Sequence, residues 1–511
     1  MVNLKKLVAT THYLFIYLFI SLSFLISFSS YWVKSYFKNV GLSEMMYTLS
    51  QPLAGSDSTQ IKSFLYDPLM KSLVCGLFVC ILFFIFKKSL ERKERYSFKL
   101  NFLLRSVSII LIFLGNTLLG IHKIGAEEIK NYFFEKSSIF ENYYVDPSDV
   151  KLTFPENKRN LIYIYLESME STYASSDIGG AESENLIPNL SNYALNEGIN
   201  FSNNALLGGA VTSPGTGFTV GGMVAQSAGI PLKVSGSYNE NEYGNTTNFM
   251  PGAVSIGDIL NNQGYKQILL LGSDADFSGR SKYYTQHGNY EMRDYKYAIE
   301  KNWIPKDYHV WWGYEDSKLF EFAKTTLTEL SSQNEPFNFT MLTADTHFPD
   351  GYKSAETPIL YEKQYSNVIH FSDRMLGEFI EWMKLQSFYE NTTIVISGDH
   401  LSMDQNFFKD ISDSYQRTVF NVILNSPIQA INEKNREFTT MDFYPTTLAS
   451  LNVEIEGNRL GLGTNLYSKK KTILEELGNK KFTSELTKQS KFYQKNIMQG
   501  SDLLDKLDTG N

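Results

Sequence analysis

The 511-residue chain has little cysteine and no excess of positive charge. Its two cysteines, Cys75 and Cys80, both fall in an apolar run. The rest of the chain can therefore form no disulfide, and a zinc or redox site of paired cysteines is excluded. The formal net charge of −8 gives a nucleic-acid-binding role no electrostatic support. Hydrophobic residues make up 43% of the chain, which is ample for a large buried core.

Three long apolar runs lie in the first quarter of the chain, at residues 13–33, 68–86 and 102–121. Each is close to the roughly 20 residues that cross a bilayer as a helix. The first run is too long for the apolar region of a typical signal peptide and has no clear cleavage site. We expect three membrane-spanning helices, the alternatives being a cleaved signal peptide or a buried core helix.

Basic residues in short loops predict the orientation of these helices. The loop at residues 87–99 carries six Lys or Arg residues, and Lys5 and Lys6 stand near the N-terminus. Both segments should be cytoplasmic. Three crossings then place everything after about residue 124 on the other side of the membrane. The expected location is the inner (cytoplasmic) membrane, multi-pass, with the large C-terminal part on the extracytoplasmic side.

The chain divides by composition into four expected parts. Residues 1–124 form the three-span transmembrane domain. Residues 125–156 form an amphipathic linker, which either lies at the membrane interface or is the first surface helix of the next domain. Residues 157–468 form the extracytoplasmic domain. Residues 469–511 form a charged helical tail, to which we assign no chemistry.

Short apolar runs that end in polar residues recur through the extracytoplasmic domain, at 160–168, 266–274, 337–347 and 392–400. Such runs are typical of strands buried on both faces of a parallel sheet. Helical patterns lie between them, for example at 365–386. The alternation predicts an α/β fold with a mostly parallel sheet between helices. Ligands of such sheets bind beyond the carboxyl ends of the strands, where these polar residues collect.

Four polar residues stand at predicted strand ends or in a glycine-rich loop: Glu167, Thr219, Asp399 and His400. Oxygen ligands with one imidazole suit a divalent ion such as manganese, magnesium or zinc. A metal beside a threonine hydroxyl would lower its pKa and activate it as a nucleophile. Taken singly, each residue also fits a helix cap, a turn or a surface group.

The glycine-rich stretch "GGAVTSPGTGFTVGGMVAQSAGIPL" (208–232) surrounds Thr219 with Gly217, Gly221 and Gly222. Glycines there would let backbone N–H groups approach a phosphate closely. A helix that begins near Thr219 would add its dipole to an anion site. The product of attack would be a covalent phospho-threonine.

At these residues the chain resembles a known family, through "NLIYIYLESMESTY", "GTGFTVGGMVAQSAGIPL", "LTADTHFPDG", "NVIHFSDRMLGEFI", "TIVISGDHLSM" and "TMDFYPTTLASL…LGLGTNL". Together these are similar to the membrane phosphoglycerol transferases, which include the phosphoglycerol transferase I and lipoteichoic acid synthase relatives. They belong to the sulfatase-like branch of the alkaline phosphatase superfamily. The likeness covers about residues 157–466, in order.

The resemblance implies roles for individual residues. Thr219 matches the nucleophile, and Glu167, Asp399 and His400 match the metal ligands, with Thr219 also contacting the ion. Arg280 and His347 fall where the family contacts the glycerol phosphate, and His347 is also a candidate acid or base. The implied cofactor is one divalent metal ion, manganese first, with magnesium or zinc as alternatives.

The implied donor is phosphatidylglycerol in the membrane, which loses its glycerophosphate head group and leaves diacylglycerol. The implied acceptor is a cell-envelope glycan or polymer. Two departures favour the phosphoglycerol transferase I side. Lipoteichoic acid synthases have five spans, and they carry a tryptophan where this chain has Ser278. The acceptor and the oligomeric state stay open.

Rival functions follow from the same fold. A phosphoethanolamine transferase shares the nucleophile, but those domains are usually rich in disulfides. A sulfatase needs a Cys or Ser in a C/S-x-P-S-R setting, which this chain lacks. A phosphodiester hydrolase stays open, because acceptor choice depends on loop shape. A silent scaffold would not require a complete set of metal ligands and nucleophile.

Other polar residues have structural interpretations. We expect His287 and His370 to be structural and Asp442 to cap the helix that follows it. Asp274 and Asp276 either line the site or form a turn.

Overall fold

A computed structural model describes residues 4–36, 41–42, 45–46, 62–92, 98–233, 248–333 and 335–500. The chain separates into two compact units. The first comprises residues 1–42 and 56–130, and the second residues 43–55 and 131–511. Part of the basic loop that predicts the membrane orientation, residues 93–97, lies outside the described residues.

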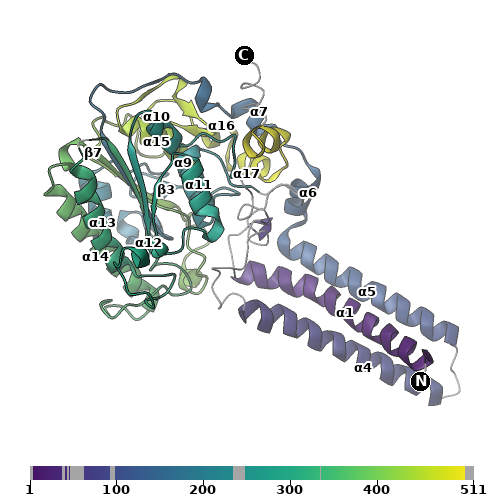
Figure 1. Cartoon of the computed structure of the whole chain (residues 1–511). Helices are drawn as coiled ribbons and strands as arrows, with labels where there is room; N and C mark the ends of the chain where they lie inside the picture. The colour runs from purple at the N-terminus through teal and green to yellow at the C-terminus, as the bar shows by residue number, and fades with distance from the viewer. Residues whose placement is uncertain are drawn as a thin grey trace. The chain divides into compact units, whose positions relative to one another are not determined.

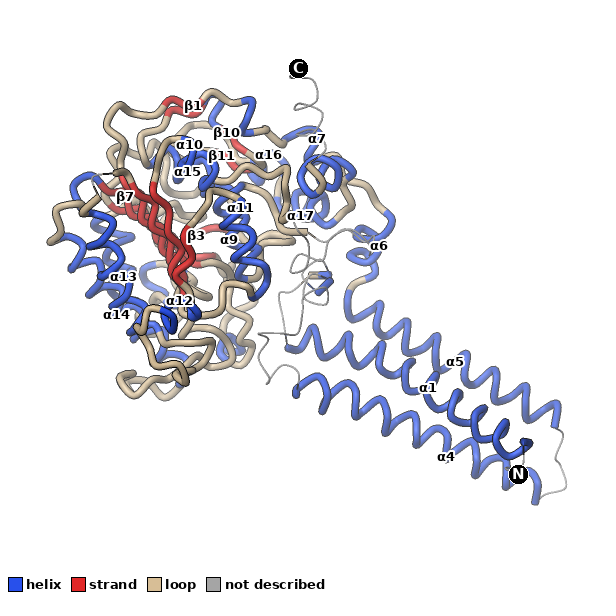
Figure 2. The backbone as a smooth tube through the Cα atoms, viewed as in Figure 1, coloured by secondary structure: helices blue, strands red, loops and turns tan. Residues whose placement is uncertain are grey.

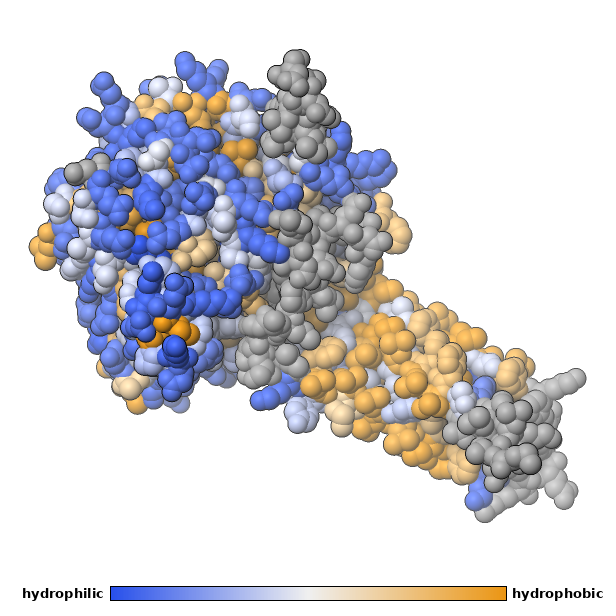
Figure 3. All heavy atoms as spheres, in the orientation of Figure 1, coloured by the Kyte–Doolittle hydropathy of each residue, from blue (hydrophilic) through white to orange (hydrophobic). Residues whose placement is uncertain are grey.

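The first unit contains three long helices, α1 (Leu4–Tyr36), α4 (Met70–Arg92) and α5 (Phe98–Ile124). Figure 1 shows them side by side. Apolar side chains cover most of the face of these helices that Figure 3 shows, and each helix is long and apolar enough to cross a membrane. Between α1 and α5, the Ser27 hydroxyl donates to Asn116 Oδ1 at 2.8 Å, and the Asn116 amide donates to Ser23 at 3.1 Å. Polar side chains thus pair between helices, as is common in membrane bundles.

The second unit is an α/β domain. Its helices are α7 (Ile139–Tyr143), α8 (Pro188–Asn192), α9 (Thr219–Ala228), α10 (Ile256–Asn262), α11 (Arg280–Gln286), α12 (Tyr295–Glu300), α13 (Asp316–Ser331), α14 (Gln364–Lys384), α15 (Phe443–Ser450), α16 (Ile473–Leu477) and α17 (Asn479–Thr487), with α6 (Ala126–Phe134) at the junction of the units. Its strands are β1 (Leu152–Thr153), β2 (Asn160–Leu166), β3 (Gly209–Ala210), β4 (Lys266–Leu271), β5 (Glu291–Arg293), β6 (Phe337–Leu342), β7 (Thr392–Gly398), β8 (Val419–Leu424), β9 (Glu454–Ile455), β10 (Arg459–Leu460) and β11 (Gly463–Thr464).

Seven strands form the central sheet, in the order β3-β8-β7-β2-β6-β4-β5 (Figure 2). The five strands from β7 to β5 are parallel, while β8 runs antiparallel to both β7 and β3. All four apolar runs at 160–168, 266–274, 337–347 and 392–400 form strands of this sheet, and the 365–386 pattern forms α14. The predicted mostly parallel α/β fold is therefore confirmed.

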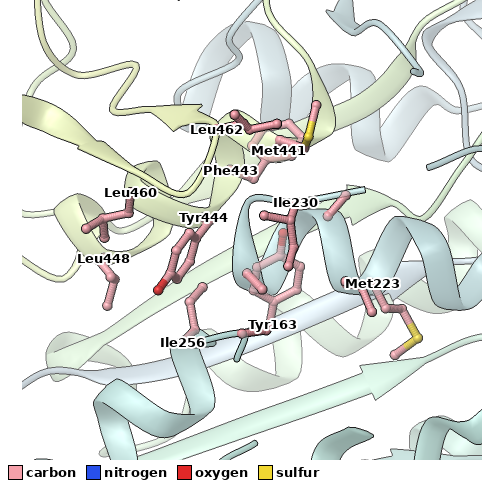
Figure 4. Close-up of a cluster of buried hydrophobic side chains, with 14 of the residues drawn as sticks. Tyr163, Met223, Ile230, Ile256, Met441, Phe443, Tyr444, Leu448, Leu460 and Leu462 are labelled. Carbon is pink, nitrogen blue, oxygen red and sulfur yellow. The ribbon is translucent and has the colours of Figure 1, made fainter. Parts of the chain in front are cut away.

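Helices cover both faces of the sheet, because successive side chains of a strand point to opposite faces. Along β2, Leu161, Tyr163 and Tyr165 pack with residues of α9, α10, α11 and α15. Ile162 and Ile164 pack on the other face with residues of α8, α13 and α14. Figure 4 shows part of the first layer. Two cores on one sheet hold the carboxyl ends of β2, β6 and β7 in fixed register.

The C-terminal segment also packs into the second unit. Ile473 and Leu474 of α16 are buried, and Arg436 pairs with Glu475 at 2.7 Å. The rings of Phe140 and Tyr493 lie 5.0 Å apart, which joins α7 to the end of the described chain. Residues on both sides of the 157–468 segment therefore contribute to the same hydrophobic core.

Candidate metal and nucleophile site

The four residues singled out from the sequence lie at one edge of the sheet. Glu167 directly follows β2, and Asp399 and His400 directly follow β7. These two strands are parallel neighbours, with Leu166 opposite Gly398, so both chains leave the sheet at the same level. Thr219 is the first residue of α9, and α9 packs on the face of the sheet that carries Tyr163 and Tyr165 of β2.

The ligand atoms lie close together. The Thr219 hydroxyl oxygen lies 3.4 Å from both Glu167 Oε2 and His400 Nε2. His400 Nε2 lies 3.5 Å from Glu167 Oε1 and 3.4 Å from Asp399 Oδ2. Ligands about 2.1 Å from a tetrahedral ion stand about 3.4 Å from one another. The four distances that involve Thr219 and His400 match this value, and one ligand atom each from Glu167, Asp399 and His400 lies within 4.8 Å of the others.

Hydrogen bonds orient the ligands toward a common centre. His400 Nδ1 lies 2.8 Å from the carbonyl oxygen of Leu401, which can only accept, so Nδ1 carries the hydrogen and Nε2 offers its lone pair. Asp399 Oδ1 accepts the backbone N–H groups of Ser168 and His400, each at 2.8 Å. Its other oxygen, Oδ2, is buried without a hydrogen-bond partner among the described residues. An orphaned buried carboxylate oxygen of this kind fits a metal ligand.

The three buried ionisable groups shift one another's protonation. Burial and the negative charge of Glu167 raise the pKa of Asp399 to about 7. Burial opposes ionisation of Glu167, but the charges of His400 and His347 outweigh it and lower its pKa. For His400, the two carboxylates outweigh burial and raise the pKa. A divalent cation would neutralise this concentrated negative charge.

Two residues of α9 fix Thr219 over the strand ends. A Cβ atom on Gly222 would stand 2.1 Å from the Asp399 carbonyl oxygen, so only glycine permits this approach. The Gln226 amide donates to the carbonyl oxygen of Gly398 at 2.9 Å, and Gln226 Oε1 accepts from the Tyr163 hydroxyl at 2.8 Å. We expected Gly222 to make room for a phosphate, whereas the structure gives it a packing role against β7.

Arg280 and His347 lie on loops and helix ends that follow β4 and β6. The Arg280 guanidinium donates to the Ser273 hydroxyl at 3.1 Å and to the Asp274 carbonyl oxygen at 2.9 Å. His347 Nδ1 lies 2.7 Å from the Phe348 carbonyl oxygen, which can only accept, so Nδ1 carries a hydrogen. His347 is near enough to Glu167 for its charge to lower the pKa of that carboxyl.

Two aromatic rings connect Arg280 and His347, the two candidate substrate residues. The sequence did not predict this connection. The Arg280 guanidinium lies 5.7 Å from the centre of the Phe277 ring. That ring lies 5.6 Å from Trp312, and Trp312 meets the His347 imidazole edge to face at 4.9 Å. Phe277 and Trp312 thus form a half-buried wall between the arginine and the histidine.

Two buried carboxylates support the loops of the site. Both oxygens of Asp316 accept backbone N–H groups, from Ala344 at 2.8 Å and from Asp345 at 2.9 Å, and so brace the loop that leads to His347. Glu170 accepts from Arg417 Nε at 2.8 Å and from the Ser402 N–H at 2.7 Å. Because their partners lie tens to hundreds of residues away, no local sequence signal could have found these roles.

The structural histidines are confirmed. His287 is buried and lies within hydrogen-bonding distance of Asp258 and the Phe249 carbonyl oxygen, and His370 meets the Leu186 carbonyl oxygen at 3.2 Å. Asp442 stands at the N-cap position of α15, as expected, but its carboxylate completes the capping box of the preceding 3-10 turn, Thr440–Asp442.

The Asp442 carboxylate makes no capping bond to α15. It accepts the backbone N–H groups of Thr439 and Thr464 instead, each at 2.7 Å, because both segments fold back onto it. Asp274 and Asp276 pair with Lys296 at 3.0 and 2.6 Å.

Glu167, Asp399 and His400 thus form a buried cluster that could hold a metal ion at the carboxyl edge of the sheet, with Thr219 beside it at the start of α9. A family profile described as Sulfatase matches residues 159–453, more than half of the chain. The chain belongs to the sulfatase family, within the alkaline phosphatase superfamily that the sequence resemblance predicted.

Curated relatives are named phosphoglycerol transferase I. The chain is 32% identical to that of Citrobacter koseri over 357 residues, which cover 67% of this chain and 43% of the relative. It is 31% identical to that of Xanthomonas campestris pv. campestris over 342 residues, which cover 64% and 46%. The matched part is thus less than half the length of these relatives. Among solved structures, the lipoteichoic acid synthase LtaP from Listeria monocytogenes aligns at 20% identity with a TM-score of 0.48, covering 62% of this chain and 79% of that one.

Proposed function

We propose that the protein transfers glycerophosphate from phosphatidylglycerol to a cell-envelope glycan or polymer, releases diacylglycerol, and passes through a phospho-threonine at Thr219. The observation that carries the proposal is the clustering of four groups at the end of a sulfatase-family sheet: His400 Nε2 lies 3.4 to 3.5 Å from the Thr219 hydroxyl, Glu167 and Asp399, and the Thr219 hydroxyl lies 3.4 Å from Glu167. The similarity to phosphoglycerol transferase I supports the choice of donor.

In this proposal Glu167, Thr219, Asp399 and His400 hold one divalent ion, with manganese as the first choice and magnesium or zinc as alternatives. When bound, the ion would lower the pKa of the Thr219 hydroxyl and neutralise charge on the phosphodiester. Arg280 binds the phosphate or glycerol of the head group. The protein is placed in the cytoplasmic membrane through residues 1–124, with the catalytic domain, residues 157–468, on the extracytoplasmic side.

In the first step the deprotonated Thr219 Oγ1, whose proton has passed to solvent, bonds to the phosphorus, and the phosphorus–oxygen bond to diacylglycerol breaks. The departing oxygen needs a proton, and the proposed donor is Nε2 of His347 in its imidazolium form, since the Nδ1 hydrogen is committed to the Phe348 carbonyl oxygen. In the second step the same Nε2 takes the proton of the acceptor hydroxyl as that oxygen attacks the phospho-threonine. The Thr219–phosphorus bond breaks, and glycerophosphate remains on the acceptor.

Donor turnover tests the proposal. Membranes with the parent chain or its Thr219→Ala variant are supplied with fluorescent phosphatidylglycerol and manganese, and diacylglycerol is followed. The variant should release diacylglycerol at least about 10⁴-fold more slowly than the parent, since it lacks the nucleophile. Thr212→Ala, in the same loop, is the matched control and should keep parental turnover.

Two results would contradict the proposal. Equal release by the parent and Thr219→Ala would exclude Thr219 as the nucleophile. Release from phosphatidylethanolamine but not from phosphatidylglycerol, with manganese, magnesium or zinc, would make the protein a phosphoethanolamine transferase.

A further inference from the structure

A polar cavity of about 340 Å³, open to solvent and lined mostly by exposed polar residues, lies at the surface of the second unit and includes none of the candidate metal ligands. Four segments that are distant in the sequence form its walls. These are Val211, residues 413–416, Glu437, and the α16–α17 corner with Leu474 and Asn479. The C-terminal tail, to which the sequence assigned no chemistry, therefore forms one side of a cavity. Its size is at the lower end of the range for small-ligand sites.

The cavity lies at the same edge of the sheet as the metal ligands. Residues 413–416 lead into β8, and β8 is antiparallel to β7, so the start of β8 lies beside the end of β7, where Asp399 stands. Val211 follows β3, which pairs with Val419 and Phe420 of β8, and it opens the loop that leads to Thr219.

A buried ion pair connects the cavity wall to the site. Arg417, next to the cavity residue Gln416, pairs with Glu170 and also donates to the Ser402 carbonyl oxygen at 2.7 Å. Glu170 stands three residues after Glu167, and Ser402 two residues after His400. The wall and the metal-ligand loops are thus braced by the same side chains, so that a molecule held in the cavity has a fixed position relative to the site.

The lining suits a neutral, hydroxyl-rich ligand. Asp413 and Glu437 offer carboxylate acceptors, while Gln416 and Asn479 offer both donors and acceptors. Within the described part of the chain, no group is hydrogen-bonded to the side chains of Asp413, Gln416 or Glu437. Val211, Leu474 and the ring of Tyr415 supply apolar surface for C–H faces, and the Tyr415 hydroxyl is anchored to the Gly179 carbonyl oxygen at 3.1 Å. Two carboxylates would repel the phosphate of the donor lipid.

We propose that this cavity binds the acceptor, as a neutral saccharide whose hydroxyl groups pair with Asp413, Gln416 and Glu437. The inference rests on the proposed function, because it assumes a transferase that needs a second substrate. It assigns the donor and the acceptor to different sides of the nucleophile. Arg280, Phe277, Trp312 and His347 follow β4 and β6, while the cavity lies on the β8 and β3 side.

The test measures binding of laminarihexaose, a neutral glucan oligosaccharide, to the full-length protein in nanodiscs by saturation-transfer NMR. Gln416→Ala and Glu437→Gln should each weaken binding by about tenfold, the effect of losing a hydrogen bond or two in a polar site. Glu300→Ala, on the exposed surface of α12, is the matched control and should leave binding unchanged. Glu300→Ala should also release diacylglycerol from phosphatidylglycerol at the parental rate.

The outcomes separate this inference from the proposed function. Thr219→Ala should bind laminarihexaose as the parent does, even though it cannot turn over the donor. Saccharide binding that the cavity variants do not weaken, or no binding by the parent, would overturn the cavity assignment and leave the transferase proposal standing. A third outcome is that the cavity variants lose saccharide binding while the parent does not turn over phosphatidylglycerol. That result would support the saccharide site and refute the proposed transferase activity.

Discussion

At the scale of single residues, the two oxygens of Asp399 have different functions. Oδ1 accepts two backbone N–H groups and fixes the carboxylate, while Oδ2 is buried without a hydrogen bond in the described structure and faces His400 Nε2. A buried charge with one unpaired oxygen is costly in an apolar core. In the proposed function a cation pairs with this second oxygen, which would offset the burial and the negative charge of Glu167 that raise the pKa of Asp399 to about 7.

Replacing Asp399 by asparagine should remove the stabilisation that a bound ion gives. An ion that binds only the folded state stabilises it by about 4 kcal/mol at a thousand times its Kd. Manganese should therefore raise the Tm of the parent chain, and EDTA should reverse the rise. Asp399→Asn should keep the Oδ1-type hydrogen bonds and show little or no rise, as measured by differential scanning fluorimetry.

Asp404→Asn is the control for this experiment. Asp404 is also buried, but its carboxylate accepts the N–H groups of Asp350 and Phe407, so both its oxygens have partners. This variant should be less stable than the parent and still respond to manganese. An undiminished manganese shift in Asp399→Asn would exclude Asp399 as a ligand.

At the scale of elements, the strands of the candidate site could be predicted and the contacts that assemble it could not. The runs ending at Glu167 and at Asp399 are almost wholly apolar, and this pattern is visible along the chain. The contact of Gly222 with the Asp399 carbonyl oxygen joins residues 177 positions apart, and a glycine-rich stretch has the same composition whether it binds a phosphate or packs on a strand. Trp312 was missed for the same reason, because only the fold brings it to His347.

Gly222→Ala should therefore disturb the position of α9. Its Cβ would stand 2.1 Å from a backbone oxygen that cannot move without shifting Asp399. We expect a loss of about 1–3 kcal/mol in the free energy of unfolding. The manganese-induced rise in Tm should also be lost, because Thr219 and Asp399 move apart.

Gly377→Ala is the matched substitution in another helix. There the three atoms nearest to the new Cβ, at 2.8 to 3.2 Å, all belong to the side chain of Asn189. This variant should lose stability and keep the manganese response. A Gly222→Ala protein with parental stability and metal response would show that α9 does not depend on this contact.

At the scale of the whole molecule, the charge is divided unevenly between the parts of the chain. Residues 1–124 hold 14 of the 47 basic and 5 of the 55 acidic residues, which leaves residues 125–511 with 33 basic against 50 acidic residues, a formal charge of −17. A surface rich in phosphatidylglycerol is also negative, so it repels this part of the chain. In the proposed function, the apolar helices of Figure 3 therefore hold an acidic domain next to an anionic donor against this repulsion.

A truncated chain that begins at residue 125 should test this division of labour. On phosphatidylglycerol vesicles its turnover should fall by about 10² or more, since the helices no longer supply a high local concentration of donor. Added salt should partly restore it, because screening weakens the repulsion between the acidic domain and the vesicle. A short-chain phosphatidylglycerol dissolved as monomers should be turned over equally by the truncated and full-length proteins, and this donor is the control for an intact site. Equal turnover of the vesicle donor by the truncated and full-length proteins would show that the helices do not concentrate the donor. A loss of turnover on the monomeric donor as well would show that residues 1–124 are needed to form the site itself.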